Sequence, residues 1–282
     1  LTEKELEEYR NGLELKVAQR TEEIQRINKE LVSEIEKKEQ TKILLHQSLE
    51  KEKELNQLKS RFISTASHEF RTPLTTILSS AELIQRYGKK WEEEKYKDHL
   101  VRITNSVEYL TNLMDDVLTI SRIESGRTAF TPSNINLNEL CEKVISDIQL
   151  SIAEKHKLNF NFLPKENHFF VDPKQMQIII QNLLSNAFKY SVDGDKIDFT
   201  IETDENLLHI KVSDDGYGIS DEDLTHLFEP FYRSLNTESI QGTGLGLTIV
   251  KNAVEMHGGT ISVYSKLGEG TTFLINIPLG RK

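Results

Sequence analysis

The sequence predicts a multidomain protein of mixed α and α/β class, in which an N-terminal coiled coil and a helical hairpin precede an α/β two-layer sandwich. Two observations predict this order. Apolar residues recur in steps mostly built from threes and fours from Val17 to Ile84 and again from Leu100 to Val117, which is the period of amphipathic helices. Polar turn residues at 131–134 end this pattern, and short helix-like and strand-like segments alternate after them. The predicted domains are a coiled-coil helix (1–58), a hairpin (59–128), a linker (129–136) and the α/β domain (137–282).

The N-terminal segment, 1–58, contains a single glycine, Gly12, and no proline, and it is dense in Glu and Lys. Its apolar residues form a narrow seam, which must pair with another helix to be buried. The successive steps of four at Ile27, Leu31 and Ile35 break the heptad phase, which locally unwinds a coiled coil. Two interpretations remain open. One is a solvated charged helix that acts as a spacer, and the other, which we prefer, is a parallel dimeric coiled coil that carries a signal.

A helical hairpin is predicted after the coiled coil. The apolar seam continues to Ile84, and Gly88 offers a helix stop. A second helix begins near Trp91, carries apolar residues in alternating steps of three and four, and ends at Gly126. A short loop makes two such helices antiparallel neighbours. Because each hairpin keeps an apolar stripe to bury, we expect a homodimer in which two hairpins form a four-helix bundle.

The C-terminal part of the chain predicts helices packed over a mostly antiparallel sheet. A proline in the first turn of Pro173–Tyr190 is typical of a helix start. The turn Asp204-Glu205-Asn206 joins two strand-like segments. The predicted helices are Leu137–His156, Pro173–Tyr190 and about Leu245–His257, and the predicted strands are Leu158–Leu163, Lys196–Thr203, Leu207–Ser213, Thr260–Ser265 and Thr271–Ile277.

Composition argues against several classes of protein. The net charge of −10 argues against nucleic-acid binding through a basic face. The single cysteine, Cys141, excludes an internal disulfide and a cysteine-rich metal site, and it suits a reducing compartment. No run approaches the roughly 18 apolar residues of a membrane span, and no signal peptide is visible. We therefore expect a cytoplasmic chain without membrane contact. Because the chain begins at Leu1 rather than Met, any sensor or membrane anchor is expected upstream.

His68 is predicted to stand on the solvent side of the first hairpin helix, because it lies about 200° around the helix from Ala66 of the seam. A surface histidine has no functional meaning by itself. Glu69 beside it, however, is able to keep one ring nitrogen protonated and leave the other free to attack. Thr72, four residues on, shares the histidine's face. Pro73 costs a helix interior about 3 kcal/mol, so we expect a bend and a functional site here.

Three polar residues on one helix face predict a site for phosphate and metal. Asn182 and Asn186 are four residues apart, and Lys189 follows one turn later. An asparagine carbonyl oxygen is a suitable Mg²⁺ ligand, and a lysine can neutralise phosphate charge. Asparagines on a helix more often cap it or face water, so this pattern gains weight only from the clusters that follow it.

Asp214 stands directly after a predicted strand and precedes two glycines, Gly216 and Gly218. Its carboxylate is able to accept a hydrogen bond from the exocyclic amine of adenine, and the glycines let the backbone approach a flat ring. A tight turn is the alternative, because Asp-Gly is a common turn pair.

A second glycine-rich stretch, Gly242-Thr243-Gly244-Leu245-Gly246, opens the last predicted helix. Free backbone amides at a helix start attract phosphate. The dinucleotide-binding type of glycine loop needs a strand immediately before it, whereas residues 235–241 are polar. The P-loop pattern fails as well, since no Lys-Ser or Lys-Thr follows the glycines.

These segments, in this order, resemble the two-component sensor histidine kinases. Ser67–Leu74 resembles the family's H-box, and residues 181–190 resemble its N-box. The resemblance implies a Bergerat-type ATP-binding fold, as in the GHKL ATPases. Asp215 stands where many relatives carry asparagine, while Asp214, at the adenine-reading position, is intact. The remaining similar segments are the F-box before a mobile lid (228–233) and three glycine boxes (214–219, 242–247 and 268–273), the last of which we expect to be a structural hairpin.

The resemblance also implies residue roles. His68 is the phosphoacceptor, Glu69 the base that assists it, and Thr72 the dephosphorylation residue. Asn186 matches the position that holds Mg²⁺ with the triphosphate, and Arg233 is a candidate partner of the γ-phosphate. The implied cofactors are ATP and Mg²⁺, and the implied nucleotide-binding residues are Asn182, Asn186, Lys189, Tyr190, Asp214, Gly216, Gly218, Gly242, Thr243, Gly244, Leu245 and Gly246.

We therefore predict an ATP-dependent protein-histidine kinase that phosphorylates itself on His68. The phosphoryl group then passes to an aspartate of a response-regulator receiver domain, and the kinase also removes phosphate from that regulator. The expected partners are a second copy of the chain and the regulator, with no nucleic acid. Three alternatives remain open: another GHKL ATPase that uses ATP for clamping, a scaffold with a degenerate ATPase domain, and a family member that mainly dephosphorylates its partner.

Overall fold

The computed structural model describes residues 3–151, 156–191, 196–204, 206–234 and 242–279. The chain divides into two units, Leu1–Ile63 and Ser64–Lys282. Helix α1 (Glu3–Tyr87) begins in the first unit and continues into the second. None of the helices in the described ranges contains a stretch long and apolar enough to cross a membrane.

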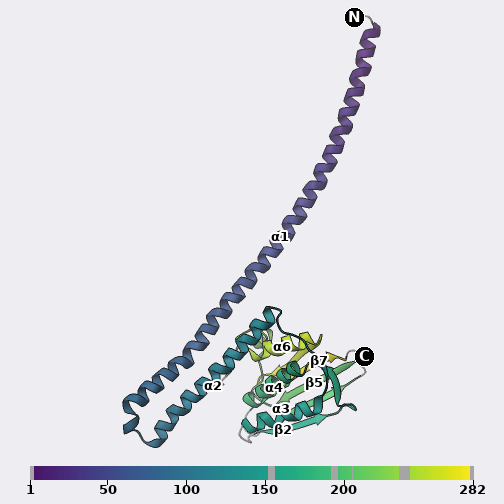
Figure 1. Ribbon diagram of the computed structural model, residues 1–282. Helices are drawn as coiled ribbons and strands as arrows, with labels where there is room; N and C mark the ends of the chain where they lie inside the picture. Colours follow the sequence, from purple (N-terminus) through teal and green to yellow (C-terminus); the bar gives the residue numbers. More distant parts are fainter. Residues whose placement is uncertain (1–2, 152–155, 192–195, 205, 235–241, 280–282) are drawn as a thin grey trace. The chain divides into compact units, whose positions relative to one another are not determined.

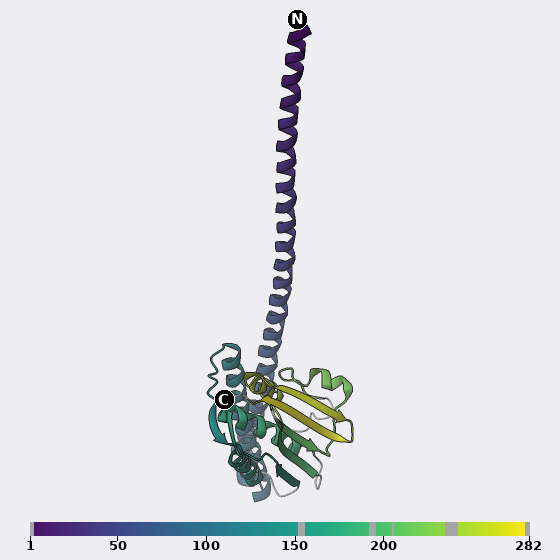
Figure 2. The ribbon, with the colours of Figure 1, turned by 90° about the vertical axis from the view of Figure 1, so that its right-hand side faces the viewer.

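The described part of the first unit is one continuous helix (Figures 1 and 2). The part of the predicted apolar seam from Val17 to Leu49 lies along it and stays exposed. Ile27 is 44% exposed and Ile35 is 63% exposed. A helix of this length has no stability from burial of its own, so its seam needs a partner helix. The coiled coil itself stays a prediction, because only one chain is present.

The second unit begins with the predicted hairpin. Helix α1 ends at Tyr87, a 3₁₀ turn covers Gly88–Lys90, and helix α2 spans Glu93–Glu124. Both predicted helix stops are confirmed. Gly126 adopts a φ of 64°, and its amide bonds the carbonyl of Ile123. With the bond from the Arg127 amide to the Arg122 carbonyl, this is a Schellman end, which uses glycine in the left-handed conformation.

The hairpin buries only part of its apolar surface. Ala66 and Pro73 of α1, and Leu113 and Ile120 of α2, are buried between the helices and their neighbours. Helix α1 continues through Pro73. A second set of apolar residues stays exposed, and it gives the hairpin the unburied stripe expected of half a four-helix bundle. These residues are Leu74, Leu78, Leu100, Val107, Met114 and Leu118.

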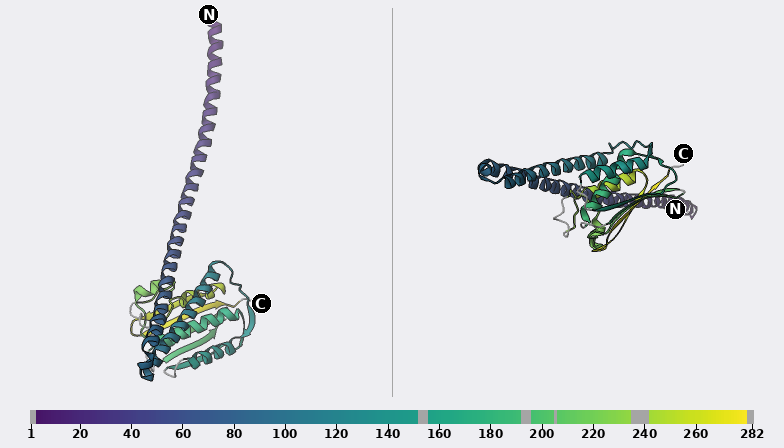
Figure 3. Two further views of the ribbon diagram at one scale, coloured as in Figure 1. Left: turned by 60° about the vertical axis from the view of Figure 1, so that its left-hand side comes forward. Right: turned by 90° about the horizontal axis from the view of Figure 1, so that it is seen from below.

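The rest of the unit is an α/β domain with a five-stranded sheet in the order β2-β4-β5-β7-β6. Strands β2 and β4 are parallel and the other neighbours antiparallel, which confirms the mostly antiparallel prediction. Helices α3, α4 and α6 lie over one face of the sheet (Figures 1 and 3). The elements are β1 (Ser133–Asn136), α3 (Leu137–Ser151), β2 (Lys157–Phe162), β3 (His168–Val171), α4 (Pro173–Tyr190), β4 (Lys196–Thr203), β5 (Leu207–Asp214), α5 (Asp221–His226), α6 (Gly246–Met256), β6 (Thr260–Lys266) and β7 (Gly270–Pro278).

Three elements of this domain were not predicted from the sequence. Strands β1 and β3 form a separate antiparallel pair, in which Ser133 lies opposite Val171. Strand β1 therefore occupies the second half of the segment predicted as a linker. The short helix α5 begins with Ser220 as its N-cap, since the Ser220 hydroxyl accepts a hydrogen bond from the Asp223 amide.

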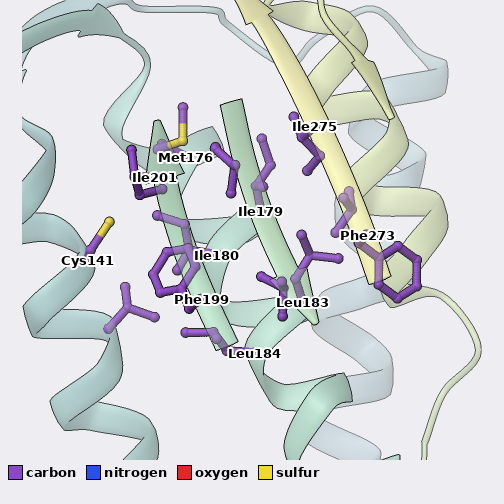
Figure 4. Packing of buried hydrophobic residues seen from close by; sticks show 14 of the residues in the cluster. Cys141, Met176, Ile179, Ile180, Leu183, Leu184, Phe199, Ile201, Phe273 and Ile275 are labelled. Carbon is purple, nitrogen blue, oxygen red and sulfur yellow. The ribbon is translucent and has the colours of Figure 1, made fainter. Parts of the chain in front are cut away.

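Helix α4 carries the centre of the core. Met176, Ile179 and Leu183 are fully buried on its inner face and pack toward the strands (Figure 4). Phe199 of β4 and Ile275 of β7 are fully buried opposite them. Burial of one such side chain stabilises a domain by about 1.5 to 3 kcal/mol. The inner face of α4 is thereby fixed by apolar packing, and its other face is left to carry polar groups.

Cys141 lies in the same core and is fully buried (Figure 4). Burial raises the pKa of its thiol to about 12, so the thiolate is not formed at neutral pH. The single cysteine is therefore a packing residue.

Candidate functional site

His68 stands on the surface of α1, as the sequence predicted. Its side chain is 74% exposed. Glu69 Oε1 lies 4.0 Å from His68 Nδ1, which is too long for a hydrogen bond but places the carboxylate on the Nδ1 side of the ring. The Thr72 hydroxyl donates to the His68 carbonyl at 3.4 Å. The structure thus brings His68, Glu69 and Thr72 together on one surface of the helix.

Tyr109 of α2 joins this group, although sequence reasoning missed it. Its hydroxyl donates to Glu69 Oε2 at 2.6 Å. Burial, together with the Glu69 carboxylate, raises the pKa of Tyr109, so the phenol keeps its proton. Tyr109 is half-buried on α2, and nothing in the spacing of the sequence indicated its partner.

A cavity of about 740 Å³ opens in the second unit. It is lined by residues of α2, α4, β5, β7 and the loops around α6. Most of the predicted nucleotide-binding residues line it: Asn182, Asn186, Lys189, Tyr190, Asp214, Gly218, Gly242, Thr243, Gly244 and Gly246, together with Arg233. These predicted residues come from four separate segments of the sequence and meet in one place. His68, Glu69 and Thr72 do not line the cavity, whereas Tyr109 does.

Two predicted residues shape the cavity without lining it. Leu245 is fully buried at the N-cap of α6 and holds the start of that helix in the core. Gly216 approaches the end of α4 closely, because a Cβ on it would lie 2.2 Å from the Tyr190 carbonyl oxygen. Both residues therefore fix the position of the backbone around the cavity and do not contact its interior.

The polar face of α4 meets the glycine-rich start of α6. The Asn182 amide nitrogen donates to the carbonyl of Ile178 at 2.9 Å, which fixes the direction of the side chain. Its amide oxygen then points at Gly246, where an added Cβ would lie only 2.5 Å away. Glycine at this position therefore leaves the Asn182 oxygen accessible beside the start of a helix, where backbone amides favour anions.

Asp214 closes the other side of the cavity at the end of β5. It is 7% exposed, and its Oδ1 accepts a hydrogen bond from the Gly216 amide at 3.0 Å. Thr271 lies opposite Asp214 in the β5–β7 pair and also lines the cavity. From the sequence, the segment around Thr271 was expected to be a structural hairpin. Its turn is indeed a hairpin, but this residue adds a hydroxyl beside the buried carboxylate.

Charged groups concentrate where the cavity meets α2. Burial lowers the pKa of Lys189, Asp116 opposes that shift, and Arg233 adds to it. Burial also raises the pKa of Asp116, whose Oδ2 accepts a hydrogen bond from the Thr243 hydroxyl at 2.7 Å. Asp116 was missed from the sequence, since a charged residue on a helix usually faces water. It places a carboxylate among groups suited to phosphate.

The donor chemistry fits a nucleotide with a magnesium ion. The described residues hold no cluster of three His, Cys, Asp or Glu side chains suited to a metal. Mg²⁺ bound with a triphosphate does not need such a cluster, because it uses few protein ligands and takes phosphate oxygens and water. The amide oxygens of Asn182 and Asn186 are suitable ligands. Residues 235–241, which the sequence showed to be polar, lie outside the described residues.

Comparisons with known proteins match this arrangement. Residues 58–126 match the family model of the His Kinase A (phospho-acceptor) domain, and residues 171–281 match that of the histidine kinase-, DNA gyrase B- and HSP90-like ATPases. The chain belongs to the histidine kinases. The autoinducer 2 sensor kinase/phosphatase LuxQ of Vibrio vulnificus is 37% identical over 228 residues, which are 77% of this chain and 26% of LuxQ.

Solved structures show the same fold for this histidine kinase. Acinetobacter baumannii histidine kinase AdeS has a TM-score of 0.61 and 26% identity, and the match covers 76% of this chain and 98% of AdeS. Histidine kinase ThkA, solved in complex with response regulator protein TrrA, has a TM-score of 0.62 at 23% identity, covering 78% of this chain and 61% of that one. The chain spans only part of its curated relatives, 26% of the length of LuxQ and 37% of that of drug sensory protein A of Synechocystis.

Proposed function

We propose that this chain is the ATP-dependent protein-histidine kinase part of a two-component system, with His68 as its phosphoacceptor. The observation that carries the proposal is the pairing of two features in one chain. An exposed histidine has a carboxylate on its Nδ1 side, and a cavity gathers amides, cations and glycines suited to a nucleotide. Use of ATP and a single buried cysteine both favour a cytoplasmic location.

The reaction is a phosphoryl transfer from ATP to the His68 ring. Because Glu69 lies on the Nδ1 side, Nε2 of the neutral ring is the attacking atom. A bond forms between Nε2 and the γ-phosphorus, the bond from that phosphorus to the bridging oxygen breaks, and ADP leaves. Glu69 holds the Nδ1 proton during attack and accepts it afterwards, which leaves a phosphohistidine with a neutral ring and an anionic phosphoryl group. Positioning and charge stabilisation supply most of the rate.

Residues of the cavity hold the triphosphate for this transfer. Lys189 and Arg233 supply positive charge, and the start of α6 supplies backbone amides. Asp214 is placed to accept a hydrogen bond from the adenine amine. Asn182 and Asn186 would hold Mg²⁺, which when bound neutralises part of the triphosphate charge.

The phosphoryl group then passes from His68 to an aspartate of a response-regulator receiver domain, and the exposed position of His68 leaves room for that partner. A kinase of the same fold, ThkA, is solved with a response regulator bound. The Thr72 hydroxyl, on the same helix surface, serves dephosphorylation of the regulator. The exposed apolar stripe of the hairpin supports a homodimer, since burying it needs a second copy.

Incubation with labelled ATP tests the proposal. The wild-type protein should take up label that is lost in acid and stable in alkali, as expected for a phosphorylated histidine. His68→Gln should remove the label while Mg-ATP binding, measured by calorimetry, survives. His46→Gln, which changes another exposed histidine of α1, is the matched control and should label normally. Equal labelling of His68→Gln, or label that survives acid, would refute the assignment.

A further inference from the structure

We propose that Tyr109 is a positioning residue for the phosphoacceptor reaction, which it serves by orienting the Glu69 carboxylate toward the His68 ring. This proposal rests on the proposed function, since it assigns Glu69 the role of the base. It adds a residue of α2 to a group that the sequence placed wholly on α1. Its basis is the short contact between the Tyr109 hydroxyl and Glu69.

The two oxygens of Glu69 face different neighbours. Oε2 accepts the hydrogen bond from the Tyr109 hydroxyl at 2.6 Å, a distance typical of a charge-assisted O–H···O⁻ bond. Oε1 is turned to the His68 side and lies 4.0 Å from Nδ1. Contacts between catalytic groups are often this long before substrate binds and shorten afterwards. The bond to Tyr109 therefore selects which oxygen faces the histidine.

Tyr109 is suited to this work because it can only donate to Glu69. Its raised pKa keeps the phenol protonated, with burial as the main cause. Glu69 is itself half-buried, with 28% of its side chain exposed. A glutamate with three rotatable bonds loses considerable freedom when it is fixed, and a hydrogen bond to a charged group offsets that loss. Without the hydroxyl, the carboxylate is free to turn toward water.

Tyr109 also faces the nucleotide cavity, whose lining it shares with Asp116 and Arg233. Both charges act on its hydroxyl: Arg233 lowers its pKa and Asp116 raises it. One side chain thus contacts the proposed base and borders the proposed phosphate site. A tyrosine that only linked α1 to α2 would not need to border the cavity. A test must therefore separate orientation of Glu69 from stability of the hairpin.

The test compares Tyr109→Phe, Glu69→Gln and the double variant in the full chain. Tyr109→Phe keeps the ring and removes only the hydroxyl, and it should slow autophosphorylation at saturating ATP about tenfold. The KM for ATP should stay within about twofold of wild type, because the hydroxyl holds the base and not the nucleotide. In the Glu69→Gln background, adding Tyr109→Phe should change the rate by less than about twofold. Tyr96→Phe, also on α2, is the matched control and should behave as wild type.

Nitrogen NMR of the His68 ring supplies a readout that does not depend on activity. In the wild-type protein without nucleotide, the tautomer protonated at Nδ1 should dominate, because Glu69 faces that nitrogen. Tyr109→Phe and Glu69→Gln should both reduce its population, while Tyr96→Phe should leave it unchanged. This measurement decides the matter if Glu69→Gln is too slow for kinetics.

Three results would overturn the role of Tyr109. These are a wild-type rate and tautomer in Tyr109→Phe, a rate loss that is equally large in the Glu69→Gln background, and a loss that Tyr96→Phe shares. Failure of the proposed function looks different, because the wild-type protein itself then takes up no acid-labile label on His68. The two failures are therefore distinguishable in one set of experiments.

Discussion

Two glycines in the same unusual backbone conformation allow steric contact at the site to be separated from backbone strain. Gly218 has a φ of 67° and Gly268 a φ of 79°. A Cβ on Gly218 would lie 2.0 Å from the Lys266 carbonyl oxygen, whereas a Cβ on Gly268 would meet nothing within 4 Å. Gly218 lines the cavity, and Gly268 lies in the neighbouring β6–β7 turn, where its amide donates to the carbonyl of the cavity residue Tyr217 at 2.7 Å. Replacement by alanine is therefore expected to lower the free energy of unfolding by different amounts at the two positions.

The magnitudes follow from these contacts. The left-handed conformation costs an alanine about 1 to 2 kcal/mol, and this is the whole expected effect of Gly268→Ala. Gly218→Ala adds a clash with backbone that cannot move aside, at about 1 to 3 kcal/mol, so its total is about 2 to 5 kcal/mol. For a domain of this size each kcal/mol lowers the Tm by about 2 to 4 °C. We expect a fall of about 2 to 8 °C for Gly268→Ala and about 4 to 20 °C for Gly218→Ala.

Scanning calorimetry with and without Mg-ATP measures both consequences. Gly218→Ala should also lose most of its affinity for Mg-ATP, because the loop carrying Asp214 and Gly218 must separate from the β6–β7 turn. Gly268→Ala should bind Mg-ATP within about threefold of wild type, since its methyl group points into open space. Equal losses of Tm in the two variants, or normal nucleotide binding by Gly218→Ala, would refute the reasoning.

Two carboxylates give further predictions. Asp116→Asn should tighten Mg-ATP binding about 5- to 30-fold in titration calorimetry. It removes a negative charge beside Lys189 and Thr243, whose repulsion of the triphosphate is about 1 to 2 kcal/mol. Unchanged or weaker binding would contradict this. For Asp172, burial disfavours the charge, but hydrogen bonds from the Thr131 amide and hydroxyl and from the first amides of α4 outweigh it and lower the pKa. Asp172→Ala should therefore cost about 1 to 2 kcal/mol of unfolding free energy at pH 7. The difference in unfolding free energy between wild type and variant should be fully present above about pH 3.9, the pKa of Asp in the unfolded chain. It should shrink as the pH falls through the lower pKa that Asp172 has in the folded protein, and a difference that is constant down to about pH 2 would contradict the explanation.

Local signals predicted the elements whose ends are fixed by local chemistry. Helix α4 has the predicted bounds, since Asp172 caps it and Pro173 occupies its first turn. Strand β4 also has its predicted bounds, because alternating apolar residues define Lys196–Thr203 and place Phe199 in the core. The glycine stop after α2 was visible for the same reason. In each case the deciding residues lie within a few positions of the element's end.

What the sequence missed depends on pairing between distant segments. Strand β1 is Ser-Asn-Ile-Asn, which has turn composition and becomes a strand only by pairing with β3. The parallel neighbours β2 and β4 are likewise separated by all of β3 and α4, so no hairpin signal joins them. Tyr109 and Asp116 are polar residues on α2 whose partners come from α1 and from the start of α6. These contacts form only in the folded chain, and no spacing in the sequence predicts them.

The segment between the hairpin and the sheet is held at both ends. The Arg127 amide is bonded to the last turn of α2, and the Thr131 amide donates to Asp172 at 2.7 Å. Phe130 packs edge-on against the His257 ring, 4.9 Å between centroids. Only residues 128–130 lie between the fixed points, and the four Cα–Cα steps from Arg127 to Thr131 span about 14 Å at full stretch. A connection this short limits how far the α/β domain can move from the end of α2. A larger movement must first break the hydrogen bond between Thr131 and Asp172 or unfold the last turn of α2.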